Sequence, residues 1–479
     1  MDRREFIKST AIIAAGTGTS QLVAASNPAS GQMKPKAPAE PETPAEGKLI
    51  ISAPMLQNYA ETSMGIAFAV SDLANGYAIY GEQADLSDGK MVKCGGYRVT
   101  DMNDKVMLIR LTGLKPATRY YYRIGADRIH YGGGYDMKII GHEEDERIYT
   151  FRTAGKKADA HFCVINDTHV QWEAIAAVMD KVAELKPECV IWNGDASNTE
   201  ETIENQIDIF LTPHIDRKDY AAETPYLFCC GNHDSRGMAN RHLERVWMYR
   251  QPEERASRDW DLGRNFAVRM GDVALIGLDT AEDKLDTNPH FAGLFSSAAY
   301  REAQVAWLKD ALRHPKVESA PFLLAFCHIP LFCDDPKANP GDIAPDDTDP
   351  AYHTNFAAWQ RTCANLWTTL LKKAGCQLIV CAHEHVFRYD APTKERPWGQ
   401  LVGGGHDMDP KYKDSFPTVI EGRTEGDALK ITVYNVRDKS VEKELCFLSR
   451  KGKKGEEEEK VKRGKKAKKG KNGKSRKKA

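Results

Sequence analysis

Apolar residues recur with two different spacings along the chain, and these spacings divide it into two regions. Between residues 48 and 153, short apolar runs such as 66–70 and 106–111 predict strands, and glycine-rich turns such as 132–134 separate them. From His161 onward, strand-like runs alternate with helical spacing. Because a strand–helix–strand order predicts a parallel sheet, we expect an all-β region followed by a region of mixed α/β structure.

The helical spacing is clearest at 172–185, where the apolar residues of one face are Ile175, Val178, Met179 and Val182. A second helix is predicted at 304–312. The run FAVRMGDVALIGLDT predicts a β-hairpin that turns at Gly271 and Asp272. From Leu401 to about residue 448 the chain is again rich in predicted strands.

Five apolar runs in the second region end directly in polar residues: HFCVI-NDTH, ECVIW-NGD, YLFCC-GNHD, FLLAF-CHIP and QLIVC-AHEH. Sites in α/β sheets form beyond the carboxyl ends of strands, so these five ends are expected to converge on one crevice. Asp167 and His169 are two positions apart, as are His383 and His385, so each pair can face one side of an extended segment. Oxygen and imidazole groups of this kind are metal ligands.

Glycines precede two of these polar groups. Gly194 stands before Asp195, and Gly231 stands before Asn232 and His233. Because glycine has no side chain, we expect the backbone to approach the crevice closely at both positions.

The five polar groups resemble the motifs of the calcineurin-like metallophosphoesterase family, which are D-x-H, G-D, G-N-H-[DE], a lone His and G-H-x-H, in this order. The matching residues are Asp167-Thr168-His169, Gly194-Asp195, Gly231-Asn232-His233-Asp234, His328 and His383-Glu384-His385. Ala382 stands where the family usually has Gly, which changes a backbone position and not a ligand. The resemblance covers residues 160–448 and implies the family's fold, a four-layer α-β-β-α sandwich (α+β / α/β).

The resemblance also implies a centre of two divalent or trivalent metal ions, for which Mn, Fe, Zn and Co are all compatible. The implied ligands are three for the first ion, three for the second and one bridging carboxylate: Asp167, His169 and His385, then Asn232, His328 and His383, and Asp195 as the bridge. A hydroxide that bridges the two ions would attack the phosphorus atom.

Three further residues receive roles from the same resemblance. His233 would protonate the leaving oxygen or stabilise the transition state. Asp234 would orient His233 and favour its charged form. Arg236 would contact the phosphate of the substrate.

The function implied is that of a metal-dependent phosphoric ester hydrolase, a phosphatase or phosphodiesterase that acts on phosphate monoesters or diesters. Nucleases and cyclic-nucleotide phosphodiesterases share the motif set, so the substrate stays open. An alternative from another class is a surface-binding protein whose metal site is vestigial.

Residues 48–155 are predicted to form a fibronectin type III-like or Ig-like β-sandwich. The evidence is a segment that resembles a tyrosine-corner strand, with Leu114, Pro116, Thr118, Tyr120 and Tyr122. A sandwich followed by a phosphoesterase domain resembles the layout of purple acid phosphatases. Those enzymes have a tyrosine three residues after the bridging Asp and a Gly in the first motif. This chain has Asn198 and His169 at these positions, so a purple iron-tyrosinate centre is not expected.

The two ends of the chain differ from its body. Residues 1–25 resemble a twin-arginine export signal, with Arg3 and Arg4 ahead of a short apolar run, and 26–47 form a Pro/Ala/Glu-rich linker. Residues 449–479 predict a disordered Lys-rich tail, because from Arg450 onward 16 Lys/Arg oppose four Glu in a chain of net charge −1. We therefore expect a bacterial protein exported to the periplasm, the extracellular medium or the cell surface, with a tail suited to polyanions.

No apolar run approaches the ~20 residues that a membrane-spanning helix needs, so no transmembrane segment is expected, and no obligate protein partner is evident. Most of the eleven cysteines lie in apolar runs and are expected in the core. His290, His353 and His406 fall in predicted loops that could overhang the crevice, and each is expected to be an ordinary surface or hydrogen-bonding histidine.

Overall fold

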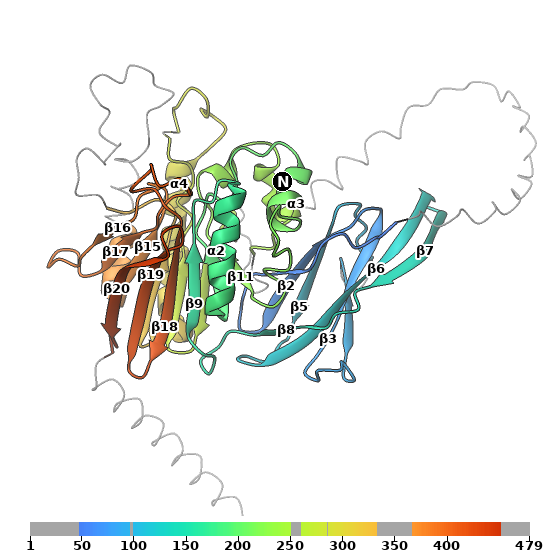
Figure 1. The fold of residues 1–479 in the computed structure, drawn as a ribbon, viewed down its shortest axis with the longest axis horizontal. Coiled ribbons are helices and arrows are strands. Elements are labelled where there is room, and N and C mark those ends of the chain that lie inside the picture. Colours follow the sequence, from blue (N-terminus) through green and yellow to red (C-terminus); the bar gives the residue numbers. More distant parts are fainter. Residues whose placement is uncertain (1–46, 96–98, 251–259, 285, 333–365, 452–479) are drawn as a thin grey trace, which may run out of the picture. The chain divides into compact units, whose positions relative to one another are not determined.

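The computed structural model describes residues 47–95, 99–250, 260–284, 286–332 and 366–451. The predicted export signal, the predicted linker as far as residue 46, His353 and the predicted tail from residue 452 lie outside the described residues. From Gly47 onward the chain belongs to one unit. Figure 1 shows its strands and helices, coloured from blue in the first region to red at the end of the second.

The largest sheet contains strands from both sequence regions. Its strands β9, β10, β11 and β1 are parallel, and antiparallel strands flank them. The order is β20 (Ser440–Leu448), β19 (Ala428–Asn435), β18 (Thr418–Glu425), β9 (His161–Ile165), β10 (Cys189–Trp192), β11 (Tyr226–Phe228), β1 (Met55–Gln57), β2 (Ser63–Ala69) and β5 (Val106–Thr112). Hydrogen bonding between β1 and β11 therefore continues one sheet across the boundary between the two regions.

A second sheet of six strands belongs to the second region alone. Four of its strands are parallel, and the edge strands β12 and β16 are antiparallel to their neighbours. The order is β12 (Phe266–Met270), β13 (Val273–Gly277), β14 (Phe322–Phe326), β15 (Leu378–Cys381), β17 (Gly399–Val402) and β16 (Arg388–Asp390). Strands β12 and β13 form the predicted hairpin, in which Gly271 has a left-handed backbone with φ of 53°.

The two sheets pack face to face, and helices cover their outer faces. The rings of Phe162 on β9 and Phe326 on β14 meet between the sheets with centroids 6.1 Å apart. The helices are α2 (Trp172–Leu185), α3 (Ile203–Phe210), α4 (Ser297–Arg313), α5 (Pro315–Glu318) and α7 (Thr368–Ala374), with the 3₁₀ turns η1 (His233–Ser235) and η2 (Asn240–Arg245). Apolar residues of α2 and α3 pack on the nine-stranded sheet, and those of α4 and α7 pack on the six-stranded sheet. The predicted four-layer α-β-β-α sandwich is confirmed.

Local sequence explains where these helices begin and end. The predicted apolar face of α2 is buried as expected. At the start of α3, Thr202 and Asn205 exchange side-chain-to-backbone hydrogen bonds and form a capping box. Gly375 ends α7 in a left-handed conformation. Helix α4 begins seven residues before the predicted 304, because its first two turns, SAAYREA, are polar and carry no apolar periodicity.

The first region forms a five-stranded sheet in addition to the strands that it contributes to the large sheet. Its strands are β4 (Lys90–Lys93), β3 (Ala74–Gly81), β6 (Arg119–Gly133), β7 (Asp136–Glu144) and β8 (Tyr149–Arg152), and β7 and β8 both pair with β6. Near the start of β6, the backbone N–H of Lys115 donates to Tyr120 Oη at 2.9 Å, a contact of the tyrosine-corner kind. Met64, Ile66 and Phe68 of β2 share a buried cluster with the aromatic residues of β6.

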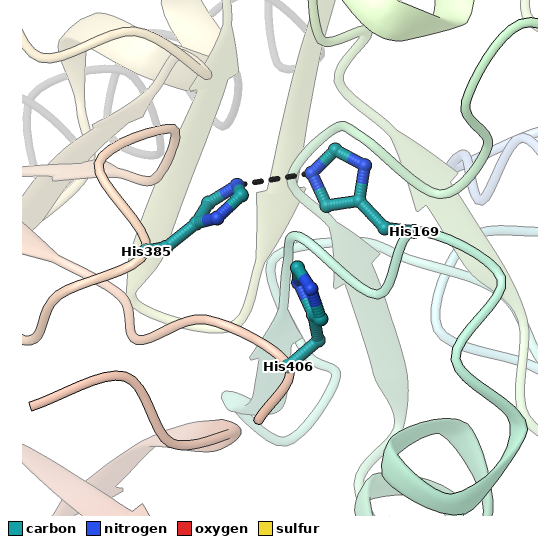
Figure 2. Close-up of side chains that lie close together, drawn as sticks. All are labelled: His169, His385 and His406. Atoms are coloured by element: carbon teal, nitrogen blue, oxygen red, sulfur yellow. Dashed lines mark hydrogen bonds between the residues drawn. The ribbon is translucent and has the colours of Figure 1, made fainter. Parts of the chain in front are cut away.

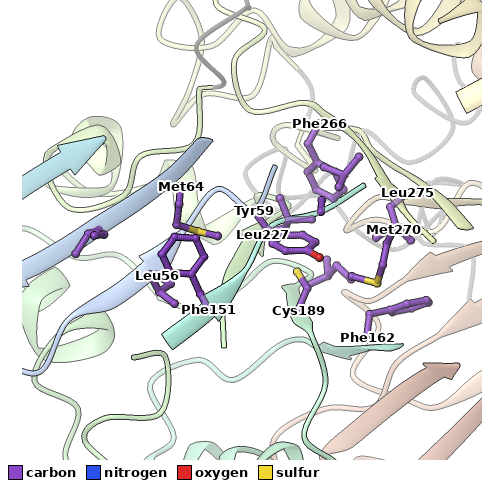
Figure 3. Close-up of a cluster of buried hydrophobic side chains, with 14 of the residues drawn as sticks. Leu56, Tyr59, Met64, Phe151, Phe162, Cys189, Leu227, Phe266, Met270 and Leu275 are labelled. Carbon is purple, nitrogen blue, oxygen red and sulfur yellow. The ribbon is translucent and has the colours of Figure 1, made fainter. Parts of the chain in front are cut away.

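One hydrophobic core runs through both regions. Figure 3 draws part of it, from Leu56, Met64 and Phe151 of the first region to Phe162 and Phe266 of the second. Eight of the nine described cysteines are buried, which confirms that most cysteines of the described part are core residues. Among the described residues, no helix is long and apolar enough to cross a membrane.

Buried Gln57 supplies polar contacts between the two regions. Its Nε2 donates to Val246 O at 3.0 Å, and its Oε1 accepts from Met248 N at 2.9 Å. Because Gln57→Ala removes the partner of both groups, it is expected to lower the free energy of unfolding by about 2–3 kcal/mol. Guanidinium denaturation of the full chain measures this loss. The matched control is Gln83→Ala, a change at an exposed glutamine. If both variants lowered the free energy of unfolding equally, the contacts of Gln57 with Val246 and Met248 would not stabilise the fold.

Candidate metal centre

All seven predicted ligands lie beyond the carboxyl ends of parallel strands. Three of the five predicted strands are in the nine-stranded sheet and two are in the six-stranded sheet, so the crevice lies at the ends of both sheets. The ligands follow their strands in this order: Asp167 and His169 after β9, Asp195 after β10, Asn232 after β11, His328 after β14, and His383 and His385 after β15.

The structure brings four of these residues into a first group: Asp167, His169, Asp195 and His385 offer ligand atoms within 4.8 Å of one another. The Nε2 atoms of His169 and His385 are 3.0 Å apart. His169 Nε2 also lies 3.5 Å from Asp195 Oδ2, and His385 Nε2 lies 3.5 Å from Asp167 Oδ1. Carboxylate and imidazole atoms so arranged could hold one metal ion.

A second group contains Asp195, His328 and His383. His328 Nε2 lies 3.1 Å from Asp195 Oδ2. Asn232 lies beside this group, with its Oδ1 3.0 Å from His383 Nδ1. Asp195 thus belongs to both groups, as the predicted bridge requires.

Unsatisfied polar atoms in this crevice fit a cation. Asp167 Oδ1 and His328 Nε2 are buried and have no hydrogen-bond partner. The Nδ1 of His328 faces Asn193 O at 2.9 Å, and the Nδ1 of His169 faces Asn198 Oδ1 at 2.9 Å. Because these oxygens only accept hydrogen bonds, the proton of each neutral ring is on Nδ1. The lone pair is then on Nε2, which points into the groups.

The carboxylates make the crevice strongly negative. Burial lowers the pKa of His328, but the charges of Asp195 and Asp167 outweigh burial and raise this pKa to about 10. A fully buried imidazole would normally be neutral. The site therefore demands positive charge, which bound metal ions would supply.

The backbone at the ligands is in a sparsely populated conformation. Five of the seven have left-handed φ angles: Asp167 (45°), His169 (44°), Asp195 (48°), His383 (73°) and His385 (57°). Such a conformation costs on the order of 1–3 kcal/mol for a non-glycine residue and is held only where the surroundings enforce it. These five strained residues are the ones whose side chains turn into the crevice.

Two glycines allow the ligand segments to touch one another. A Cβ at Gly194 would collide with the ring of His328, and a Cβ at Gly231 would collide with the carboxylate of Asp195. The predicted close approach of the backbone at both glycines is confirmed.

Asp234 contacts the ligand-bearing segments through its carboxylate. Its Oδ2 accepts from the backbone N–H of Gly231 and of Asp195, both at 2.8 Å, and its Oδ1 accepts from the N–H and hydroxyl of Ser197. His233 Nδ1 has no hydrogen-bond partner. The carboxylate of Asp234 does not bond to the ring of His233, and it joins the two ligand-bearing segments that follow β10 and β11. Burial, with a contribution from Asp195, raises the pKa of Asp234 to about 6.

His233 borders the groups on the side of Arg236. Its backbone N–H donates to Asp195 Oδ1 at 2.9 Å, and its Nε2 lies 3.0 Å from Arg236 Nη1. Arg236 is in turn held by the carboxylates of Glu282 and Asp283. Burial lowers the pKa of His233 to about 4 against the opposing charge of Asp195, so the ring without metal is neutral at neutral pH.

Sequence reasoning missed two residues that the structure places at the crevice. Asp283 follows β13 and has Oδ2 3.9 Å from His383 Nε2. His406 follows β17 and forms a group with His169 and His385 within 4.8 Å, whereas it was expected to be an ordinary loop histidine. Both strands end in the pattern that identified the other ligands: GLDTAED follows the run VALI, and GGGH follows QLV. Neither belongs to the five motifs, and the polar residue comes several positions after the strand.

Comparison with known proteins agrees with this site. Residues 160–387 match the calcineurin-like phosphoesterase family. Purple acid phosphatase PPD1 from seeds of yellow lupin (Lupinus luteus) has a similar structure, with TM-score 0.55 and 13% identity over 83% of this chain and 74% of that chain. A structure of PhoD has TM-score 0.55 and 11% identity over 85% of this chain and 90% of that chain. At these identities the two structures show the fold alone, and no curated protein sequence matches the chain.

The chain carries a calcineurin-like phosphoesterase domain at residues 160–387. This domain makes it a metal-dependent phosphoester hydrolase. Clustered His and Asp residues of this domain could hold metal ions.

The contacts of Asp234 predict a structural effect. Asp234→Ala leaves the buried N–H groups of Gly231, Asp195 and Ser197 without their acceptor, so the free energy of unfolding is expected to fall by about 3 kcal/mol or more. Chemical denaturation measures this against exposed Asp216→Ala, expected to change stability by less than ~0.5 kcal/mol. Wild-type stability combined with lost activity would instead support an orienting role.

Proposed function

We propose that the chain hydrolyses phosphate monoesters or diesters with two metal ions that share Asp195. The first ion would be held by Asp167, His169, His385 and Asp195, and the second by Asn232, His328, His383 and Asp195. The observation that carries this proposal is the membership of buried Asp195 in two separate ligand groups. The ligands are oxygen and imidazole without thiolate. Mn, Fe, Zn and Co all suit such ligands, so the ligand set does not select among these four metals.

Two bound ions would activate water near neutral pH and neutralise the charge of a phosphate. The residues of the chain position that chemistry. Asn198 and Asn193 fix the rings of His169 and His328, so their Nε2 atoms stay directed into the groups. Asp234 joins the ligand segments and keeps them from separating.

We propose that His233 stabilises the transition state or protonates the leaving oxygen. Its place beside Asp195 and outside both ligand groups supports this role. Arg236 lies against His233 Nε2, and its guanidinium is already bound by Glu282 and Asp283. We therefore propose that Arg236 chiefly positions His233 and that any contact with phosphate is secondary.

The same ligand set serves monoesterases, diesterases, nucleases and cyclic-nucleotide phosphodiesterases. A panel of monoester, diester and nucleic-acid substrates distinguishes them. A vestigial site in a surface-binding protein would fail the whole panel and would retain no metal.

For the remainder of the chain, we propose a fibronectin type III-like sandwich at 48–155, a phosphoesterase domain at 160–448, and export directed by residues 1–25. The contact between Lys115 and Tyr120 supports the sandwich. The sequence alone supports the export signal, the linker at 26–47 and a polyanion-binding role of the tail at 449–479. A periplasmic, extracellular or cell-surface location follows from that signal.

Removing one ligand tests the proposed activity. His383→Ala is expected to reduce kcat for a chromogenic phosphate ester by at least about 10³-fold, because the second ion loses a ligand and several kcal/mol of transition-state stabilisation. His290→Ala, a change at an exposed loop histidine, is the matched control and should keep full activity. Full activity of His383→Ala would refute the ligand assignment.

Metal binding should also stabilise the fold. Ions that bind only the folded state, added to the chelator-treated chain at ~100 times their dissociation constant, are expected to add about 2.7 kcal/mol of stability. Thermal melts with and without Mn²⁺ or Zn²⁺ measure this gain. Asp195→Ala should gain far less, and identical melts of the wild type in both conditions would contradict metal binding.

A further inference from the structure

His406 stands beside the first ligand group, although none of the five motifs includes it. It is half-buried and follows β17, the parallel neighbour of the strand that precedes His383 and His385. Figure 2 shows the rings of His169, His385 and His406 turned toward one another. Their centroids lie 4.8 Å apart for His169–His385, 5.1 Å for His169–His406 and 5.0 Å for His385–His406.

This nearly equilateral triangle has the size that one metal ion imposes on three imidazoles. With metal–nitrogen bonds of ~2.0–2.1 Å and tetrahedral angles, the ring centroids are separated by roughly 5 Å. Each ring offers a nitrogen within 4.8 Å of the other two. The angles between ring planes, 63°, 62° and 73°, also resemble one another, as in rings that surround a common axis.

The hydrogen bond that His406 makes through Nδ1 leaves its Nε2 available to a metal ion. Its Nδ1 lies 3.2 Å from the backbone oxygen of Asp167, which can only accept. Nδ1 therefore carries the proton, and Nε2 of the neutral ring carries a lone pair. His169 and His328 have the same arrangement, with Nδ1 bound to an oxygen of Asn198 or Asn193. Metal-binding histidines are commonly fixed by such an outer hydrogen bond.

The loop that carries His406 is built against the ligand segments. A Cβ at Gly403 would collide with the side chain of Asn166, and a Cβ at Gly405 would lie 2.9 Å from His385 Cβ. Asn166 Nδ2 donates to Gly404 O at 2.7 Å and to Asp167 Oδ2 at 2.7 Å. The glycines and Asn166 thus hold the loop where His406 meets both histidines of the first group.

We propose that His406 is a further ligand of the ion in the first group, which would then be held by three imidazoles as well as by carboxylates. The inference rests on the proposed two-metal function. A third imidazole makes this position selective for ions that prefer nitrogen, such as Zn²⁺ or Co²⁺, over Mg²⁺.

The test measures metal affinity directly, by titrating Co²⁺ into the chelator-treated full chain and following both calorimetry and the visible d–d absorption. The decisive variant is His406→Asn, because the Asn amide nitrogen can replace Nδ1 in the bond to Asp167 O but supplies nothing in place of Nε2. His406→Ala removes both, and exposed His290→Asn is the matched control. Circular dichroism checks that each variant is folded.

We expect His406→Asn and His406→Ala to weaken one of two Co²⁺ equivalents by at least about 10-fold and to change its absorption spectrum, while His290→Asn leaves both unchanged. Wild-type affinity and spectrum in His406→Asn would overturn the proposal, even if His406→Ala binds weakly, since His406 would then act only through its hydrogen bond. Two tight equivalents in wild type and in His406→Asn would leave the proposed function intact. A wild-type chain that binds no metal would refute both proposals.

Discussion

The centre depends on one electrostatic constraint, which is that buried Asp195 and Asp167 require positive charge beside them. Neither carboxylate is exposed to water. Their combined field is strong enough to raise the pKa of buried His328 to about 10, although burial alone would lower it. Removing the counter-charge from a buried anion costs several kcal/mol. The proposed pair of metal ions would meet this need better than a protonated ring, because the ions would also bind Asp167 Oδ1 and His328 Nε2.

The fold meets this constraint by using two sheets that end in the same place. Parallel strands from each sheet deliver their carboxyl ends to the crevice, and the left-handed residues after them turn the ligands inward. Those conformations cost energy, so the surroundings must enforce them. The shared core between β9 and β14 supplies rigid support, and the buried carboxylate of Asp234 joins the segments that follow β10 and β11. Stability and ligand geometry therefore depend on the same contacts.

Much of this arrangement was predictable because it is local in the sequence. The apolar face of α2, the β12–β13 hairpin and the five strand ends are all visible as short patterns. The i, i+2 spacing assumed an extended segment, whereas Asp167, His169, His383 and His385 have left-handed φ angles. His383 and His385 therefore do not share one face and belong to different groups. The features that escaped prediction depend on contacts between distant segments. The union of β1 with β11 depends on a parallel pairing across about 170 residues of chain, which no local pattern records. The contacts of Asp234 escaped prediction for a related reason, since its partners Asp195 and Ser197 come from another loop. His406 was expected to be an ordinary loop histidine, although it follows a strand in the sequence QLVGGGH, with three glycines between.

Anomalous scattering from crystals of the full chain grown with Zn²⁺ or Mn²⁺ tests the central claim most directly, because it locates each ion without reference to activity. The account predicts two peaks about 3.5–4 Å apart, with the Asp195 carboxylate between them. One peak should lie beside Asp167, His169 and His385, and the other beside Asn232, His328 and His383. A single peak, or two peaks of which only one contacts Asp195, would contradict the account.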